Sequence, residues 1–216
     1  MSQKAVIFDL DGTLLDTIDD IKNAMNHALT AHQLPNYNTE EYKLFIGEGL
    51  RVLGERAVPE AEHHQLDSVI NHFKEYYKDH CADMTRPYDG IDQLLVELSQ
   101  RNILLAVLSN KPHLATVQVI ADYFPNTPFK VVAGQKDEIP RKPDAAGALL
   151  IADELGLETD QCYFVGDTKI DILTAVNSNM NAVGVTWGFR EKAELLEAGA
   201  QYLINSPVEL LDILNG

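Results

Sequence analysis

The sequence predicts an α/β protein whose core is a doubly wound, Rossmann-like parallel sheet, with an inserted α-helical cap domain. Three observations support this prediction. Short, nearly continuous apolar runs alternate with amphipathic helical patterns. One interval of about 90 residues after the first run carries only helical patterns. Polar residues gather where the apolar runs end, as expected at the carboxyl edge of a parallel sheet.

Six β-rich apolar runs are expected to form the sheet. They do not alternate between apolar and polar residues, which is typical of strands buried on both faces. The runs cover residues 5–8, 103–109, 130–134, 162–166, 182–187 and 201–205.

Helical patterns fill the intervals between these runs. Residues 89–101 and 144–155 repeat apolar side chains three and four positions apart, which predicts amphipathic helices. Residue types that favour helix starts predict further helices beginning near Pro112, Thr168, Glu191 and Ser206.

The interval after the first strand is interpreted as an inserted helical domain. Helices are expected from Thr17 to about Gln33, from Thr39, and from Ala61 to His80, with Thr17 as a capped start. The predicted domains are therefore residues 1–16 with 83–216 for the core and 17–82 for the cap. An insertion leaving the carboxyl end of the first strand would lie over a site at that edge.

Composition narrows the class of function. The formal net charge of −16 argues against nucleic acid or an anionic membrane as partner. The longest apolar stretch, residues 103–108, is too short to span a bilayer, and the N-terminal residues do not resemble a secretory signal. Cys81 and Cys162 are interpreted as reduced thiols of a cytoplasmic protein. An anionic substrate would need local positive charge.

The stretch VIFDLDGTLLDT ends an apolar run with two carboxylates, Asp9 and Asp11. Side chains two positions apart in an extended chain point the same way, so both acids should face one point. Like charges this close repel unless a cation lies between them or one carboxylate holds a proton. The spacing therefore predicts that Asp9 and Asp11 have a chemical function rather than a role in stability.

Other predicted strand ends supply matching groups. Ser109 and Asn110 follow the second run, Asp167 follows the fourth, and Lys142 directly precedes a helix. Hard carboxylate oxygens and a lysine suit Mg²⁺-assisted chemistry on a phosphoryl group. Asp9 is the candidate nucleophile, and Asp11 is the candidate general acid and base. Ser109 and Lys142 would bind phosphate oxygens, and Asn110 is a further candidate substrate-binding residue. A divalent ion would lie between Asp9 and Asp167.

Structural alternatives remain open for several of these residues. Asp167 could be the N-cap of the following helix, although Thr168 could also serve, and Asp171 could be a first-turn acid that favours the helix dipole. Arg141 and Lys111 are interpreted as solvent-facing. In the cap, the loop containing Gly47 and Arg51 could contact substrate or could simply be a turn between helices.

Four motifs together resemble those of the haloacid dehalogenase (HAD) superfamily of phosphohydrolases. They are DLDGT at 9–13, SNK at 109–111, Lys-Pro at 142–143 and GDTKID at 166–171. The resemblance implies that Asp9 is the nucleophile and Asp11 the general acid and base, and that Ser109 and Lys142 bind phosphate. It implies Mg²⁺ held by Asp9, the Asp11 carbonyl and Asp167, with Asp171 supporting the metal's water shell or orienting the lysine.

Further stretches resemble the phosphoglycolate phosphatase branch: FIGEGLRVLGERA at 45–57, NKP at 110–112 and GVTWGF at 184–189. An acid at position 11 is typical of the family's phosphatases and mutases. The expected function is Mg²⁺-dependent hydrolysis of a small phosphorylated metabolite, first of all phosphoglycolate, by a monomer or homodimer. The alternatives are another phosphatase (sugar phosphate, nucleotide or pyrophosphate), a β-phosphoglucomutase-like phosphotransferase, or a non-catalytic binding protein.

Overall fold

A computed structural model describes residues 3–215 and divides the chain into two compact units. The core unit consists of Met1–Leu15 and Pro87–Gly216, and the helical unit of Asp16–Arg86. The limits expected from the sequence, 17 and 82, differ from those of the helical unit by one and four residues. The chain passes between the units through two short paired strands, β2 (Leu15–Asp16) and β3 (Arg86–Pro87).

The core unit contains a six-stranded parallel sheet in the order β5-β4-β1-β6-β7-β8, which confirms the predicted fold class. Each strand overlaps one of the six apolar runs. The strands are β1 (Ala5–Phe8), β4 (Leu104–Pro112), β5 (Phe129–Gln135), β6 (Cys162–Gly166), β7 (Asn181–Val185) and β8 (Tyr202–Ile204).

The strand order reverses direction at β1. From β1 the chain goes to β4 and outward to β5, and then returns to β6 on the other side of β1 before it continues outward. The parallel register places Phe8 beside Val107 of β4 and Val165 of β6. The carboxyl ends of β4, β1 and β6 therefore meet at a topological switch point, where open α/β sheets bind their ligands.

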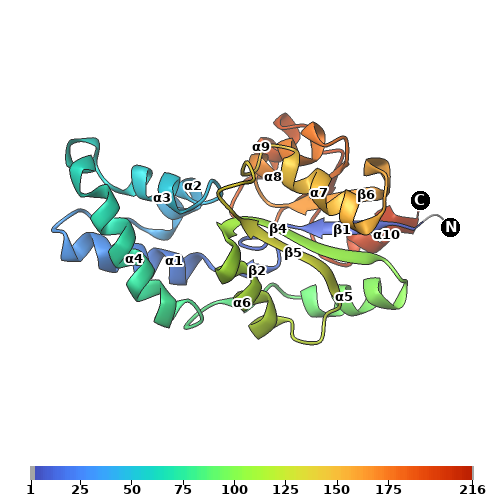
Figure 1. Cartoon of the computed structure of the whole chain (residues 1–216), viewed down its shortest axis with the longest axis horizontal. Coiled ribbons are helices and arrows are strands. Elements are labelled where there is room, and N and C mark those ends of the chain that lie inside the picture. Colours follow the sequence, from blue (N-terminus) through green and yellow to red (C-terminus); the bar gives the residue numbers. More distant parts are fainter. Residues whose placement is uncertain (1–2, 216) are drawn as a thin grey trace. The chain divides into compact units, whose positions relative to one another are not determined.

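Helices cover both faces of this sheet (Figure 1). On β1, Val6 and Phe8 join the apolar cluster of one face, whereas Ala5 and Ile7 join that of the other, because successive side chains of a strand alternate. The first cluster includes residues of α5 (Ile91–Gln100), α6 (His113–Tyr123) and α10 (Glu209–Asn215). The second includes residues of α7 (Ala146–Leu155), α8 (Lys169–Asn177) and α9 (Lys192–Glu197), and the short 3-10 helix η2 (Thr159–Gln161) precedes β6.

The helical unit is built on the packing of α1 (Ile18–Ala31) against α4 (Leu66–His80). Apolar side chains of both helices, including Leu29 and Phe73, are buried. Two features differ from the sequence interpretation. A 3-10 helix, η1 (Glu60–Gln65), precedes α4 where one continuous helix was expected, and α3 (Leu50–Ala57) follows α2 (Thr39–Phe45) as a separate helix.

The start of α1 is not capped as the sequence predicted. Thr17 occupies the N-cap position, but its hydroxyl makes no capping bond and has no hydrogen-bond partner among residues 3–215. The predicted capped start is therefore wrong. Instead, the buried Asp20 carboxylate accepts hydrogen bonds from the Met84 and Thr85 N–H groups and from the Thr85 hydroxyl. This contact joins the first turn of α1 to the end of the unit.

Two expectations from composition can be compared with the described residues. Within residues 3–215, no helix is both long and apolar enough to cross a membrane. Cys81 and Cys162 are both free, and burial raises the pKa of the Cys162 thiol to about 11. A thiol with so high a pKa is protonated and unreactive at neutral pH.

Candidate active site

Three buried carboxylates meet at the switch point of the core sheet. Asp9 follows β1, Asp167 follows β6, and Asp171 lies in the first turn of α8. One oxygen from each lies within 4.8 Å of the others. The sequence predicted this group, because the ends of neighbouring parallel strands share an edge.

The electrostatics of this cluster favour a bound cation. Burial and the charges of Asp171 and Asp167 raise the pKa of Asp9 well above its ordinary value, although Lys142 opposes the shift. Burial and Asp171 raise the pKa of Asp167 to about 7. The raised pKa values indicate that the cluster lacks the positive charge needed to keep all its carboxylates ionised. A divalent cation such as Mg²⁺, which prefers hard oxygen ligands, would supply that charge and relieve the repulsion.

Asp167 is fixed by its neighbours. Its Oδ1 accepts a hydrogen bond from the Thr13 hydroxyl at 3.1 Å, and its Oδ2 accepts one from the Phe189 N–H at 2.8 Å. Gly12 has φ +87°, and a Cβ there would lie 2.3 Å from Asp167 Oδ2. A Cβ on Gly188 would lie equally close to Asp167 Cβ. The carboxylate is therefore enclosed by backbone that only glycine permits at both positions.

Lys142 links two of the carboxylates. Its Nζ is 2.8 Å from Asp9 Oδ1 and 2.7 Å from Asp171 Oδ1, and the side chain is almost fully buried. Burial lowers the pKa of Lys142, but Asp171 and Asp9 outweigh this effect and hold it above the ordinary value. The ammonium therefore stays charged beside Asp9, and Lys142 is not the surface lysine that its sequence position alone would allow.

Asp171 has two structural tasks in the described residues. Its Oδ1 accepts the hydrogen bond from Lys142, and its Oδ2 accepts bonds from the N–H and hydroxyl of Thr168 in a capping box. Thr168 is thus the N-cap of α8, so Asp167 is not. These contacts favour Asp171 as the residue that orients the lysine.

Asn110 positions the backbone of Lys142 through two hydrogen bonds. The Asn110 side chain accepts from the Lys142 N–H at 2.9 Å and donates to the Lys142 carbonyl at 3.1 Å. Asn110 was expected to bind substrate, and the structure gives its amide this positioning task. The sequence did not predict this pair of hydrogen bonds, called the Asn110 clamp below, because 32 residues separate Asn110 from Lys142.

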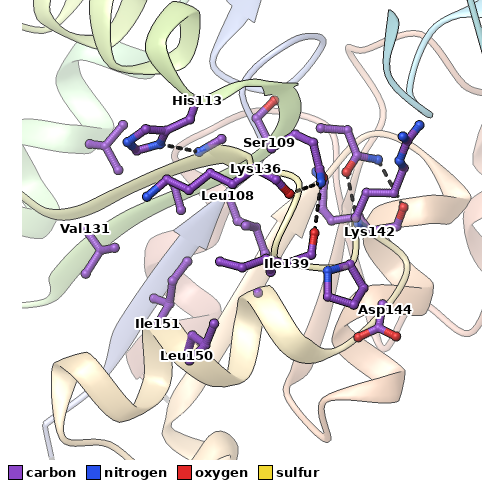
Figure 2. Close-up of a pocket in the computed structure, with 18 of the residues that line it drawn as sticks. Leu108, Ser109, His113, Val131, Lys136, Ile139, Lys142, Asp144, Leu150 and Ile151 are labelled. Carbon is purple, nitrogen blue, oxygen red and sulfur yellow. Dashed lines mark hydrogen bonds between the residues drawn. The ribbon is translucent and has the colours of Figure 1, made fainter. Parts of the chain in front are cut away.

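The segment before Lys142 also forms part of a cavity of about 480 Å³ in the core unit (Figure 2). Val131 of β5 and Ile151 of α7 contribute apolar walls, and Lys142 and Ser109 lie at the same cavity. The Gln135 side chain donates to the carbonyls of Lys136 and Ile139, which fixes the loop that leads to the lysine.

Asp11 and Lys111 form an ion pair outside the three-carboxylate cluster. Lys111 Nζ lies 3.0 Å from Asp11 Oδ1, and the Lys111 side chain is only 6% exposed. The interpretation of Lys111 as solvent-facing is therefore wrong. Its side chain starts at the carboxyl end of β4, close to the switch point, and the polar stretch Ser109-Asn110-Lys111 gave no signal of this direction.

The remaining predicted residues lie in both units. Ser109 is buried at the end of β4, where its Oγ accepts a hydrogen bond from the Lys111 N–H. In the helical unit, Gly47 has φ +117° in the loop before α3. Arg51 is exposed and pairs with Asp67 at 2.9 Å and Glu55 at 3.2 Å, all within that unit.

Comparisons with known proteins agree with these features. Residues 6–185 match the family model of the haloacid dehalogenase-like hydrolases. A phosphoglycolate phosphatase of Mesorhizobium japonicum is 31% identical over 199 residues, which cover 89% of this chain and 86% of the relative. The N-acetylmuramic acid 6-phosphate phosphatase of Pseudomonas aeruginosa is 29% identical over 100% of this chain and 96% of its own length.

Solved structures share the fold over almost all of the chain. The crystal structure of a candidate phosphoglycolate phosphatase from Lactobacillus delbrueckii subsp. bulgaricus is 34% identical, with a TM-score of 0.92 and 99% of both chains covered. A second one, from Haemophilus somnus, is 26% identical with a TM-score of 0.90, and the match covers 98% of this chain and 97% of that chain.

Proposed function

This chain belongs to the haloacid dehalogenase-like hydrolases, and we propose that it hydrolyses phosphoglycolate in a Mg²⁺-dependent reaction through an aspartyl phosphate on Asp9. The chain is a phosphatase, as are the curated relatives that it matches. The family match confirms the resemblance inferred from the four motifs.

One observation carries the proposal. Asp9 is buried at the switch point with Lys142 Nζ 2.8 Å from its Oδ1 and the Asp167 carboxylate in the same cluster. A nucleophile needs electrostatic support at the phosphoryl group that it attacks, and this arrangement supplies a fixed ammonium for that purpose.

In the first half-reaction, a carboxylate oxygen of Asp9 attacks phosphorus and the bond from phosphorus to the ester oxygen breaks. Asp11, in its protonated form, gives its proton to the leaving oxygen, which departs as glycolate with a neutral hydroxyl. Lys142 stabilises the charge that develops on the phosphoryl oxygens, and Ser109 donates a hydrogen bond to them.

In the second half-reaction, water attacks the phosphorus of the aspartyl phosphate. Asp11 takes the proton of that water, and inorganic phosphate leaves while Asp9 returns to a carboxylate. Asp9, the carbonyl of Asp11 and Asp167 are the residues proposed to hold Mg²⁺. When bound, the ion would neutralise phosphoryl charge as a Lewis acid. Asp171 would keep Lys142 in place through both steps.

The proposed setting is a cytoplasmic enzyme, monomeric or homodimeric, that acts on a small phosphorylated metabolite. The helical unit would serve as the cap that contributes to substrate selection, with Gly47 and Arg51 as its candidate residues. A sugar phosphate is the second candidate substrate, because a relative that matches the entire chain is an N-acetylmuramic acid 6-phosphate phosphatase. Nucleotides, pyrophosphate and a β-phosphoglucomutase-like transfer are further alternatives for the same chemistry.

The test is phosphate release with Mg²⁺ across phosphoglycolate, sugar phosphates, nucleotides and pyrophosphate. Asp9→Asn should abolish release, whereas Asp137→Asn, which changes an exposed carboxylate of the core unit, should not. Acid-quenched protein from a reaction with ³²P-labelled ester should carry label that hydroxylamine removes. A preference for another ester would overturn the substrate, and the absence of hydroxylamine-sensitive label would overturn the intermediate.

A further inference from the structure

Lys111 places a second ammonium group at the candidate site, separate from Lys142. Its Nζ is 3.0 Å from Asp11 Oδ1 and 3.3 Å from Oδ2. The two side chains of this pair are 6% and 14% exposed. Lys142 lies beside Asp9 and Asp171, so the two lysines pair with different carboxylates.

Hydrogen bonds hold the backbone of Lys111 at both its N–H and its carbonyl. Its N–H donates to Ser109 Oγ at 3.2 Å, and its carbonyl accepts from the buried Thr116 hydroxyl at 3.2 Å. Gly134 of β5 allows a close approach, since a Cβ there would lie 2.7 Å from the Lys111 carbonyl oxygen. The side chain therefore starts from a fixed point and is directed at Asp11.

Keeping the Lys111 ammonium at a mostly buried position costs free energy, so we ask what function the charge could serve. Burying an ammonium loses its hydration and the freedom of a long side chain, and one ion pair offsets only part of this loss. A methionine of similar length would fill the same space without burying an ammonium, but the Asp11 carboxylate would then lose its partner. The position of the charge, next to the residue proposed to protonate the leaving oxygen, indicates what the use is.

We propose that Lys111 is a specificity-determining residue that binds the carboxylate of the leaving group. The inference rests on the proposed function, in which the ester oxygen lies within hydrogen-bond reach of Asp11. Lys111 Nζ then lies within about 6 Å of that oxygen. In phosphoglycolate the carboxylate carbon is two bonds from the ester oxygen, so an attraction between the carboxylate and the ammonium follows directly. Phosphorylated 2-hydroxy acids are the substrate class selected.

The competing role for Lys111 is to position Asp11 alone. A positioning role affects the protonation of every leaving group, so its loss would lower kcat for charged and uncharged esters alike. Recognition of the carboxylate affects only esters that carry one, and its loss would raise KM for those esters. The two roles therefore differ in a matched pair of substrates.

The experiment measures kcat and KM of the full chain with Mg²⁺ for phosphoglycolate and for phosphoglycolamide, its uncharged amide. The variants are Lys111→Met, Lys111→Arg and the control Lys192→Met, which changes an exposed lysine of the core unit. Wild type should prefer phosphoglycolate by about tenfold or more in kcat/KM. Lys111→Met should lose that preference through a rise in KM for phosphoglycolate alone, whereas any change in kcat, since Lys111 also pairs with Asp11, should be the same for both esters. Lys111→Arg should retain the preference.

Three results would count against the assignment. Equal losses for both esters in Lys111→Met would make Lys111 a positioning residue for Asp11, and unchanged kinetics would remove it from substrate binding. If wild type is active on neither ester, the proposed function fails and the assignment fails with it. The rate on the amide also reports that the variant is folded, so a loss confined to phosphoglycolate cannot come from unfolding.

Discussion

In the core unit, Asp9, Lys142 and Asp167 are almost fully buried, and each contacts at least one polar group fixed by the fold. In the helical unit, the candidate residue Arg51 is 57% exposed and pairs with acids of its own unit. Exposed ion pairs contribute little because water and salt screen them, whereas buried charges are held in one geometry. The core unit therefore holds its candidate residues in one geometry through buried contacts, whereas the candidate residue Arg51 of the helical unit has only exposed ones.

The largest expected effect that tests this contrast comes from Lys142→Met. The substitution removes the ammonium between Asp9 and Asp171 and the charge proposed to stabilise the transition state. Activity should fall on the order of 10³-fold, mainly in kcat. Lys192→Met, at an exposed position of the core unit, should leave kcat within about twofold. If kcat of Lys142→Met were near that of the wild type, Lys142 would have no role in the chemical step.

A smaller effect is expected from Gly12→Ala. The new Cβ would lie 2.3 Å from Asp167 Oδ2 at a φ of +87°, so the variant carries both overlap and backbone strain. The free energy of unfolding should fall by about 2–4 kcal/mol. Gly156→Ala is the matched control, because its φ is +67° but nothing lies within 4 Å of the added Cβ. Thermal unfolding should show a clearly larger drop in Tm for Gly12→Ala, and equal drops would mean that Asp167 moves aside at little cost.

The pH dependence of Mg²⁺ binding follows from Asp167. Burial and Asp171 raise the pKa of Asp167 to about 7, so below that pH a proton competes with the ion. The apparent Kd for Mg²⁺ should rise about tenfold from pH 8 to pH 6 in calorimetric titrations. Because the pKa of Asp167 is raised on folding, the metal-free fold also loses stability as pH rises from about 4 to 7. Since Mg²⁺ should bind more tightly at pH 8 than at pH 6, it should increase Tm more at pH 8.

Asp167→Asn is the control for this titration. It keeps the size of the side chain and removes the Asp167 carboxylate, so it should bind Mg²⁺ weakly. The pH dependence that remains would report Asp9, whose pKa is also raised. Equal Kd values for the wild type at both pH values would show that no proton is displaced when the ion binds, and would count against the cluster as the metal site.

Much of the core site could be predicted from the sequence because its signals are local. The apolar runs identify strands, and Asp9, Ser109 and Asp167 stand at strand ends, so parallel topology brings them to one edge. The fold class and the family were both confirmed.

What could not be predicted depends on contacts between distant residues. The Asn110 clamp on Lys142 and the bond from Thr13 to Asp167 join positions 32 and 154 residues apart. The direction of Lys111 depends on a backbone that Thr116 and Gly134 hold in place. At the start of α1, where Thr17 makes no capping bond, Asp20 accepts hydrogen bonds from Met84 and Thr85, which lie 64 and 65 residues away.

The smallest expected effect lies in the helical unit, and it decides whether the contrast between the units holds for substrate binding. Arg51→Ala removes an exposed side chain and its pairs with Asp67 and Glu55, so Tm should change by less than about 2 °C. If Arg51 contributes to binding as predicted, KM for phosphoglycolate should rise about threefold with kcat unchanged. Lys43→Ala, which breaks an exposed pair with Glu40 in the same unit, should change neither constant. A fall in kcat for Arg51→Ala would instead mean that the helical unit takes part in the chemistry, and the division of tasks drawn between the units would be wrong.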